Sequence, residues 1–226
     1  LNALRRQALQ ELADRRLELP RRRQEGFHPG VRYENRRQPP VLTVSVRLAE
    51  QVTRELCALK PALLYLPAEE GAAHPEKVEL ALSMGVPVAA ALPRVMFDRE
   101  RDTVLDQLLR LRELGVTEAL AGGWGMLPLA RELGFTLRGD YGLGVYNSQT
   151  LKELKRLGFA SATASFELKL AQIRDISKPV DIEMLVYGRL SLMLTQNCLI
   201  RTHTGRCTCE NNNRLTDRKG ERFPVV

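Results

Sequence analysis

Four helix ends in this sequence share one form: an apolar residue, a glycine, and a second apolar residue that opens the next β-rich run. They are Met84-Gly85-Val86, Leu114-Gly115-Val116, Leu133-Gly134-Phe135 and Leu157-Gly158-Phe159. Glycine adopts the left-handed conformation that ends a helix at little steric cost, so the chain can reverse sharply there. A helix, glycine and strand unit that recurs along a chain predicts β/α repetition with a parallel sheet.

Seven short runs, most of them rich in β-branched or small apolar residues, are expected to form the strands of that sheet. They cover residues 42–46, 62–66, 86–92, 118–121, 136–140, 160–165 and 182–187. Continuous apolar strands suit a sheet that is covered on both faces. Seven units favour a TIM-like (β/α) barrel over an open doubly wound sheet. No strand is followed by a Gly-x-Gly-x-x-Gly turn, and the glycines at 139–144 have another spacing, which indicates a loop.

Three parts are expected along the chain: a basic helical arm and linker over 1–40, the barrel over 41–197, and a cysteine-containing tail over 198–226. Leucines recur at helical spacing in residues 2–17, and Pro, Arg and Gly dominate residues 18–40. The first residues have the character of mid-protein sequence, so we expect a fragment of a longer protein. No run approaches the ~20 apolar residues of a membrane span, and no signal peptide is evident, so a cytoplasmic location without a membrane partner is expected.

The net charge is +7, and arginines crowd the first 40 residues, including Arg15-Arg16 and Arg21-Arg22-Arg23. A charge run of this kind is most often a solvated arm. It can also be a phosphate-binding surface that attracts nucleic acid without reading its sequence. The sequence leaves both interpretations open.

In a (β/α) barrel the working face lies where the strands end. The polar or aromatic residues that follow the predicted strands are Arg47, Glu69, Glu70, Arg94, Trp124, Asp140, Tyr141, Glu167, Tyr187 and Arg189. We expect Arg47, Arg94, Asp140, Tyr141, Glu167 and Tyr187 to gather at one end of the barrel. Such a set suits an anionic or hydrogen-bonding substrate, and it equally suits a structural ring of ion pairs.

Roles can be assigned within this set. Asp140 and Glu167, at the ends of adjacent strands, are a candidate acid/base pair, and a substrate-orienting role fits them equally well. Tyr187 is the third candidate catalytic residue. The candidate substrate-binding residues at the strand ends are Arg47, Arg94, Tyr141 and Arg189.

Three of the four cysteines, Cys198, Cys207 and Cys209, lie close together after an apolar run from Asp181 that is expected to be a buried strand. Three thiolates in a loop can ligate zinc or an iron–sulfur cluster, and both normally require four ligands. His203 can supply the fourth ligand or be a solvated loop residue; otherwise the fourth ligand is missing or lies beyond Val226. Three unligated thiols are the alternative.

The remaining cysteine, Cys57, stands at helical spacing with Thr53 and Leu56. This position is typical of a small buried hydrophobic side chain. Four cysteines in a chain of this length do not indicate a disulfide framework.

Several segments together carry a resemblance to a known family. They are Val186-Tyr-Gly-Arg-Leu-Ser-Leu-Met193, Cys198, Leu215-Thr-Asp-Arg-Lys-Gly-Glu-Arg-Phe-Pro224, Gly139-Asp140, Val145-Tyr-Asn147-Ser and Ser165-Phe-Glu167-Leu-Lys-Leu-Ala-Gln-Ile173. Over residues 42–226 the chain resembles the peptidase U32 (collagenase-like protease) family, and most of all the carboxy-terminal barrel of its long multi-domain members. The resemblance implies a TIM-like barrel whose cysteines hold an iron–sulfur cluster; zinc, which the three thiolates could also bind, is the alternative cofactor.

The resemblance also implies roles and partners. It makes Cys198, Cys207 and Cys209 the cluster ligands and Asn147 a substrate-binding residue, while Leu190 stands where some relatives have cysteine. The family name asserts peptidase activity, but better-understood relatives act in hydroxylation of tRNA, rRNA or ubiquinone precursors. An iron–sulfur-dependent role in RNA hydroxylation, with RNA and an upstream barrel of the same polypeptide as partners, is therefore expected.

Two alternatives remain. One is a U32-type peptidase, although no Gly-x-Ser-x-Gly or His-Glu-x-x-His motif supports it in this sequence. The other is a non-catalytic barrel that docks a partner or substrate for the full-length protein.

Overall fold

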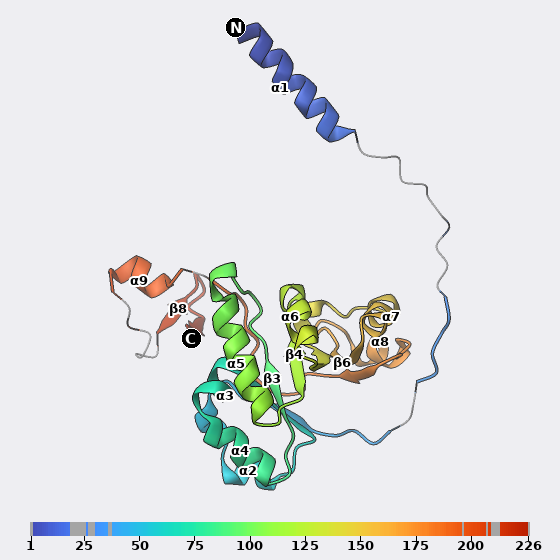
Figure 1. Ribbon diagram of the computed structural model, residues 1–226, viewed down its shortest axis with the longest axis vertical. Helices are drawn as coiled ribbons and strands as arrows, with labels where there is room; N and C mark the ends of the chain where they lie inside the picture. The colour runs from blue at the N-terminus through green and yellow to red at the C-terminus, as the bar shows by residue number, and fades with distance from the viewer. Residues whose placement is uncertain are drawn as a thin grey trace. The chain divides into compact units, whose positions relative to one another are not determined.

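A computed structural model contains one sheet of seven parallel strands, hydrogen-bonded in sequence order (Figure 1). They are β1 (Thr43–Ser45), β2 (Leu63–Pro67), β3 (Val88–Ala91), β4 (Glu118–Ala121), β5 (Thr136–Gly139), β6 (Phe159–Thr163) and β7 (Asp181–Glu183). The structure describes residues 2–18, 26, 30–35, 38–195, 197–206, 208 and 213–225. It divides into two units, Leu1–Met184 and Leu185–Val226. Each strand falls in or beside a predicted run, and the parallel sheet is confirmed.

Helices alternate with the strands. The first unit contains α1 (Asn2–Leu17), α2 (Arg54–Ala58), α3 (Ala68–Ala73), α4 (Pro75–Ser83), α5 (Arg101–Glu113), α6 (Leu127–Glu132), α7 (Ser148–Arg156) and α8 (Leu170–Asp175), with the short 3-10 helices η1 (Ala49–Gln51), η2 (Asp98–Glu100), η3 (Trp124–Met126) and η4 (Tyr141–Leu143). Gly85, Gly115, Gly134 and Gly158 have φ angles of +75°, +92°, +73° and +80°. The predicted glycine turns therefore end α4, α5, α6 and α7 in the left-handed conformation.

The main core lies between the sheet and helices α2 to α7. Leu64 and Leu66 of β2 belong to the same buried cluster as Leu108 of α5 and Leu151 of α7. Cys57 is fully buried in this cluster, which confirms its interpretation as a small hydrophobic side chain.

The opposite face of the sheet is the concave one. Here Leu63, Tyr65, Ala89 and Leu120 form a small apolar cluster of their own. β1 and β7 stand at the two ends of the strand order and are not paired with each other. Yet Thr43 of β1 and Glu183 of β7 are hydrogen-bonded through their side chains, so the sheet curls on itself. The predicted TIM-like barrel is therefore present as an open half-barrel, not as a closed one.

The expected buried strand from Asp181 to Cys198 is wrong beyond Glu183. β7 ends there, and the side chains of Val186, Tyr187 and Leu192 are exposed. The reason is that an apolar run becomes a strand only beside a partner, and β6 pairs with β7 no further than Glu183. Gly188, with a φ angle of +136°, also departs from strand geometry.

In the second unit, α9 (Leu199–Thr204) precedes an antiparallel hairpin of β8 (Arg214–Thr216) and β9 (Arg222–Pro224). Asp217 fixes the turn, because its Oδ1 accepts hydrogen bonds from the backbone N–H groups of Lys219 and Glu221. In the described part of the chain, no helix has the length and apolar character needed to cross a membrane.

Candidate functional site

Six side chains at the carboxyl ends of β3, β5 and β6 form two contacting groups, which adjoin along the backbone because Phe166 and Glu167 are consecutive residues. We call them the rim cluster: Arg94, Asp140, Tyr141, Tyr146, Phe166 and Glu167. An Arg94 Nη2 atom lies 3.5 Å from Asp140 Oδ2, and the Arg94 guanidinium carbon lies 4.0 Å from the centroid of the Tyr141 ring. The Tyr141 and Phe166 rings meet edge to face at 5.7 Å, and the Tyr146 hydroxyl donates a hydrogen bond to Glu167.

Two adjacent glycines after β4 make room for Arg94. A Cβ atom on Gly123 would lie 2.6 Å from the carbonyl oxygen of Arg94, and one on Gly122 would lie 3.1 Å from Arg94 Cγ. A backbone oxygen cannot give way as a flexible side-chain end can, so the close approach requires glycine at position 123.

Asp140 is the most enclosed carboxylate of the rim cluster, with 19% of its side chain exposed. Its Oδ1 accepts a hydrogen bond of 2.8 Å from the Tyr141 backbone N–H at the start of η4. Burial raises the pKa of Asp140; Arg94 opposes this effect and the charge of Glu183 adds to it. A carboxyl group that holds its proton above the ordinary range can serve as a general acid.

Exposed aromatic side chains follow the neighbouring strands β4 and β6. Phe166 is 52% exposed and Trp124, which begins η3 after β4, is 51% exposed. Tyr146 is also exposed, and a hydrogen bond from the Ser165 backbone N–H to the Val145 carbonyl joins its segment to the one that carries Phe166. The rim therefore combines a guanidinium, carboxylates and exposed aromatic rings.

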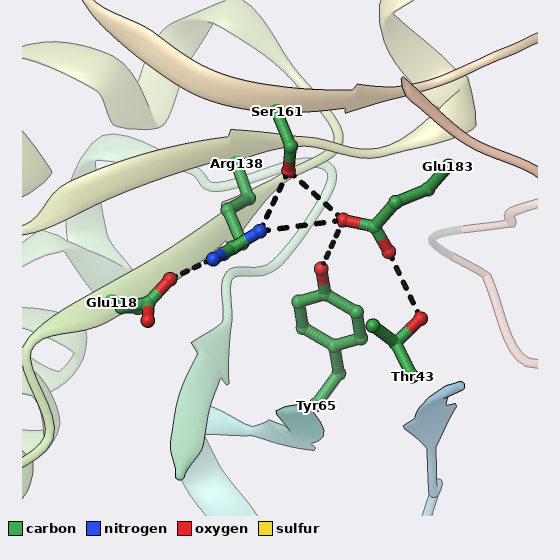
Figure 2. A network of polar contacts seen from close by, with 6 residues as sticks. All are labelled: Thr43, Tyr65, Glu118, Arg138, Ser161 and Glu183. Atoms are coloured by element: carbon green, nitrogen blue, oxygen red, sulfur yellow. Dashed lines mark hydrogen bonds and ion pairs between the residues drawn. The ribbon is translucent and has the colours of Figure 1, made fainter. Parts of the chain in front are cut away.

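A second polar group lies within the strands on the concave face. Figure 2 shows Thr43, Tyr65, Ser161 and Arg138 around Glu183, with Glu118 joined to Arg138. We call this group the barrel network: Thr43, Tyr65, Glu118, Arg138, Ser161 and Glu183. Glu183 Oε1 accepts hydrogen bonds from the Tyr65 hydroxyl at 2.6 Å and the Ser161 hydroxyl at 2.9 Å. Its Oε2 accepts one from Thr43 at 3.0 Å.

Arg138 connects the two carboxylates of this network. Its Nε donates to Glu118, and its Nη1 donates to Ser161 Oγ at 3.0 Å and lies 3.7 Å from Glu183 Oε1. Burial raises the pKa of the Tyr65 hydroxyl, and the hydrogen bond to Glu183 raises it further. Because Arg138 and Asp140 are two residues apart at the end of β5, they share a face, and the barrel network lies beneath the rim cluster.

Sequence reasoning missed the barrel network because it considered only the residues that follow strands. One signal was available: Thr136, Arg138 and Asp140 alternate with Leu137 and Gly139. A period of two with polar residues on one face indicates a strand with a polar side.

The predicted rim residues are only partly brought together. Arg94, Asp140, Tyr141 and Glu167 belong to the rim cluster, whereas Arg47 is exposed after β1 and its backbone N–H donates to Gln51. Asn147 caps α7, because its Oδ1 accepts hydrogen bonds from the backbone N–H groups of Gln149 and Thr150. Tyr187, which is fully exposed, and Arg189 belong to the second unit.

The predicted metal ligands are largely outside the described residues, because Cys207 and Cys209 are not among them. Cys198 caps α9, and its Sγ accepts a hydrogen bond of 3.3 Å from the Arg201 backbone N–H. His203 is exposed in the same helix. Among the residues that the structure describes, no three His, Cys, Asp or Glu side chains gather as a metal site would require. The cluster therefore stays a prediction.

Comparison with known proteins places this fold. The structure is similar to that of the U32 peptidase Mk0906, with a TM-score of 0.53, 16% sequence identity, and coverage of 88% of this chain and 92% of that chain. A weaker likeness is to the 3-dehydroquinate dehydratase from Aquifex aeolicus VF5, with a TM-score of 0.43, 14% identity, and coverage of 65% and 78%. No curated protein matches the chain. The model of Peptidase family U32 matches residues 71–216, well over half of the sequence, and the chain therefore belongs to that family.

Proposed function

We propose that this chain is a barrel domain of an iron–sulfur-dependent enzyme that acts in the hydroxylation of RNA, and that the rim cluster binds a base of that RNA. The observation that carries the proposal is the stack of Arg94 on the Tyr141 ring at the mouth of the half-barrel, with the exposed Phe166 ring edge to face against Tyr141. Single-stranded RNA is bound mainly by stacking its bases on aromatic side chains and guanidinium planes. Phe166 and Trp124 offer such faces.

The distribution of charge supports a polyanionic partner. Acidic residues slightly outnumber basic ones between residues 41 and 184, so the net charge of +7 comes from the two flanking segments. In the second unit, Arg214 and Arg222 lie on one face of the hairpin, and Arg218 and Lys219 lie in its turn. Basic flanks of this kind attract a phosphate backbone without sequence readout, while the rim reads the base.

The chain's own residues have separate tasks in this proposal. Arg94 is held in place by Asp140 and by the Tyr141 ring, so its guanidinium can hydrogen-bond to an oxygen of the base or of a phosphate. Burial raises the pKa of Asp140, which favours a role for its carboxyl group in proton transfer to the bound base. Cys198, Cys207 and Cys209 would hold the cluster, which would supply electron transfer when bound. The roles of the rim residues do not depend on it.

A U32-type peptidase is the second candidate, and one observation favours it. Asp140 and Glu167 follow adjacent strands in contrasting environments, since Asp140 is enclosed beside Arg94 and Glu167 is exposed beside Tyr146. Two carboxyl groups in contrasting environments are typical of acid/base catalysis.

RNA binding tests the first candidate directly. With fluorescently labelled single-stranded RNA and the full chain, we expect Phe166→Ala and Trp124→Ala each to weaken binding by roughly tenfold, since stacking contributes about 1–3 kcal/mol per base. Leu109→Ala, which removes an exposed leucine on α5, is the control and should bind as the wild type does. Equal affinities for all four proteins would refute base binding at the rim.

Activity tests separate the two candidates. RNA from cells that lack the gene should lack a nucleoside that carries one added oxygen, and the wild-type gene should restore it, whereas Cys198→Ser should not. Cleavage of gelatin that is abolished by Asp140→Asn and by Glu167→Gln would instead favour the peptidase. If the protein shows neither activity and does not bind RNA, the remaining candidate is a non-catalytic barrel that docks a partner.

A further inference from the structure

Residues 33–35 belong to the stretch that the sequence predicts as arm and linker, and they are hydrogen-bonded to a distant part of the chain. The Tyr33 backbone N–H donates a hydrogen bond of 2.7 Å to Ser177 Oγ, and the Ser177 hydroxyl donates one of 3.0 Å to the Tyr33 carbonyl. These two residues are 144 positions apart in the sequence. Both backbone polar groups of Tyr33 are therefore paired with one hydroxyl group.

Asn35 makes a second set of contacts with the same loop. Its Nδ2 donates hydrogen bonds to the carbonyls of Arg174 at 3.1 Å and Ile176 at 2.9 Å, and its Oδ1 accepts one of 2.9 Å from the Lys178 backbone N–H. An amide side chain is both a donor and an acceptor, so it can pair with two carbonyls and one N–H group at once. An ionised carboxylate at this position could only accept.

The loop that receives these groups is itself fixed in the fold. Ser177 is 5% exposed, and its backbone N–H donates a hydrogen bond of 2.9 Å to Ser148 Oγ at the start of α7. Ile176 is buried in the main core. On α7, the Lys155 Nζ atom lies 4.2 Å from the centroid of the Tyr33 ring, a distance at which a cation is attracted to the ring face. Residues 33–35 therefore dock on a surface that α7 and the loop after α8 form.

The place of docking connects the two edges of the half-barrel. Lys178 lies shortly before β7, one edge strand, whereas the chain continues from Asn35 to Thr43, which begins β1, the other edge strand. A closed (β/α) barrel joins its first and last strands within a continuous sheet. Here the backbone ladder between β1 and β7 is absent, and the chain itself leads from the docking loop beside β7 to the start of β1.

We propose that residues 33–35 are a releasable strap: when docked they restrain β1 from the β7 edge of the half-barrel, and when released they free both β1 and the basic arm. Eight arginines and four acidic residues precede Tyr33. The strap is releasable because Asn35 is exposed and Tyr33 is only partly buried. Segments with few buried apolar contacts open locally at a lower free energy than the core. The docking does not depend on the proposed function.

Amide hydrogen exchange in the full chain tests the strap. Asn35→Ala removes three hydrogen bonds, so the Tyr33 amide should exchange roughly tenfold faster or more, and the amides of β1 should also exchange faster. Asn35→Asp keeps the shape of the side chain but cannot donate to the two carbonyls, and it should have the same effect. Glu34→Gln, at the exposed residue between Tyr33 and Asn35, is the control and should exchange as the wild type does.

Two results would overturn the proposal. Equal exchange of the Tyr33 amide in Asn35→Ala and in the wild type would show that the segment is not docked through Asn35. Faster exchange of Tyr33 with unchanged exchange in β1 would show that the docked segment does not restrain that strand. Both Asn35 variants change an exposed side chain, so the barrel should stay folded, and unchanged native fluorescence of Trp124 checks this. Because exchange is measured without RNA, a failure of RNA binding would refute the proposed function and leave the strap in place.

Discussion

On the outer face of the sheet, Leu64, Val88 and Leu137 are buried in one apolar cluster with the helices, whereas on the concave face Tyr65, Arg138 and Glu183 are held by hydrogen bonds and charge. The two sets come from the same strands and alternate along them. The burial of apolar side chains stabilises the fold without requiring a particular orientation of the contacting groups. Hydrogen bonds fix direction, so the concave face is the one that can orient a substrate.

The largest expected effect is on the outer face. Leu108→Ala removes a fully buried side chain of α5 and should lower the free energy of unfolding by about 3 to 4 kcal/mol. Chemical denaturation measures this loss. Trp124 is the single tryptophan and lies at the rim, so its fluorescence in the native protein should be unchanged. A shifted native spectrum would show that the two faces are not independent.

Arg138→Met tests how much the polar contacts of the concave face contribute to the free energy of unfolding. It leaves Glu118 and Glu183 without their shared guanidinium, and breaking such a pair is costly when it is buried. Since about a fifth of each side chain is exposed, we expect a loss of about 2 to 3 kcal/mol in urea denaturation. Arg110→Met on the exposed face of α5 is the control and should cost less than about 1 kcal/mol. Adding Glu118→Gln to Arg138→Met should recover part of the loss; no recovery would mean that charge is not the cause.

Gly123→Ala tests the close backbone contact between Gly123 and Arg94. The added Cβ would collide with the Arg94 carbonyl, so we expect a loss of about 1 to 2 kcal/mol and a change in Trp124 fluorescence. Gly125→Ala is the matched control, because no atom lies within 4 Å of its Cβ position. Equal behaviour of the two variants would remove the steric argument for Gly123.

The fold could be predicted from the sequence to a large extent, because its signals are local. The glycines at 85, 115, 134 and 158 set the helix ends, and the apolar runs set the strands. The open side of the barrel could not be predicted, since it depends on pairing between strands far apart in the chain.

The residues of the candidate site could also be predicted only in part. Arg94, Asp140, Tyr141 and Glu167 were found because they follow strands, and parallel strands end on one side of a sheet. Tyr146 was missed because it follows no predicted strand, and Phe166 because only Glu167 was chosen from the residues after the run at 160–165. The roles of Tyr187 and the three cysteines stay predictions, since local sequence says nothing about where the second unit places them.

Thr43→Val is a milder test of the concave face. It removes one of the three hydrogen bonds that Glu183 accepts from hydroxyl groups and should cost about 1 kcal/mol. The backbone amides of Val44 and Ser45 should then exchange faster with solvent, because the edge strand is less firmly held. Thr136→Val, at an exposed residue that begins β5, is the control. Exchange in β1 that stays as slow as in the wild type would contradict a link through Glu183.

The smallest expected effect concerns the pH dependence of stability. Burial raises the pKa of Asp140 in the folded protein above its ordinary value, which the unfolded chain retains. Between these two values the folded state binds more protons than the unfolded state, so this group's contribution to stability is present at low pH and is lost as pH rises through the folded pKa. Asp140→Asn cannot lose a proton. Denaturation from neutral to mildly acidic pH should therefore show the wild type gaining stability relative to Asp140→Asn as pH falls. Parallel curves for the two proteins would mean that the surroundings of Asp140 do not favour its protonated form. The argument that the concave face orients its side chains would then rest on the hydrogen bonds of Glu183 alone.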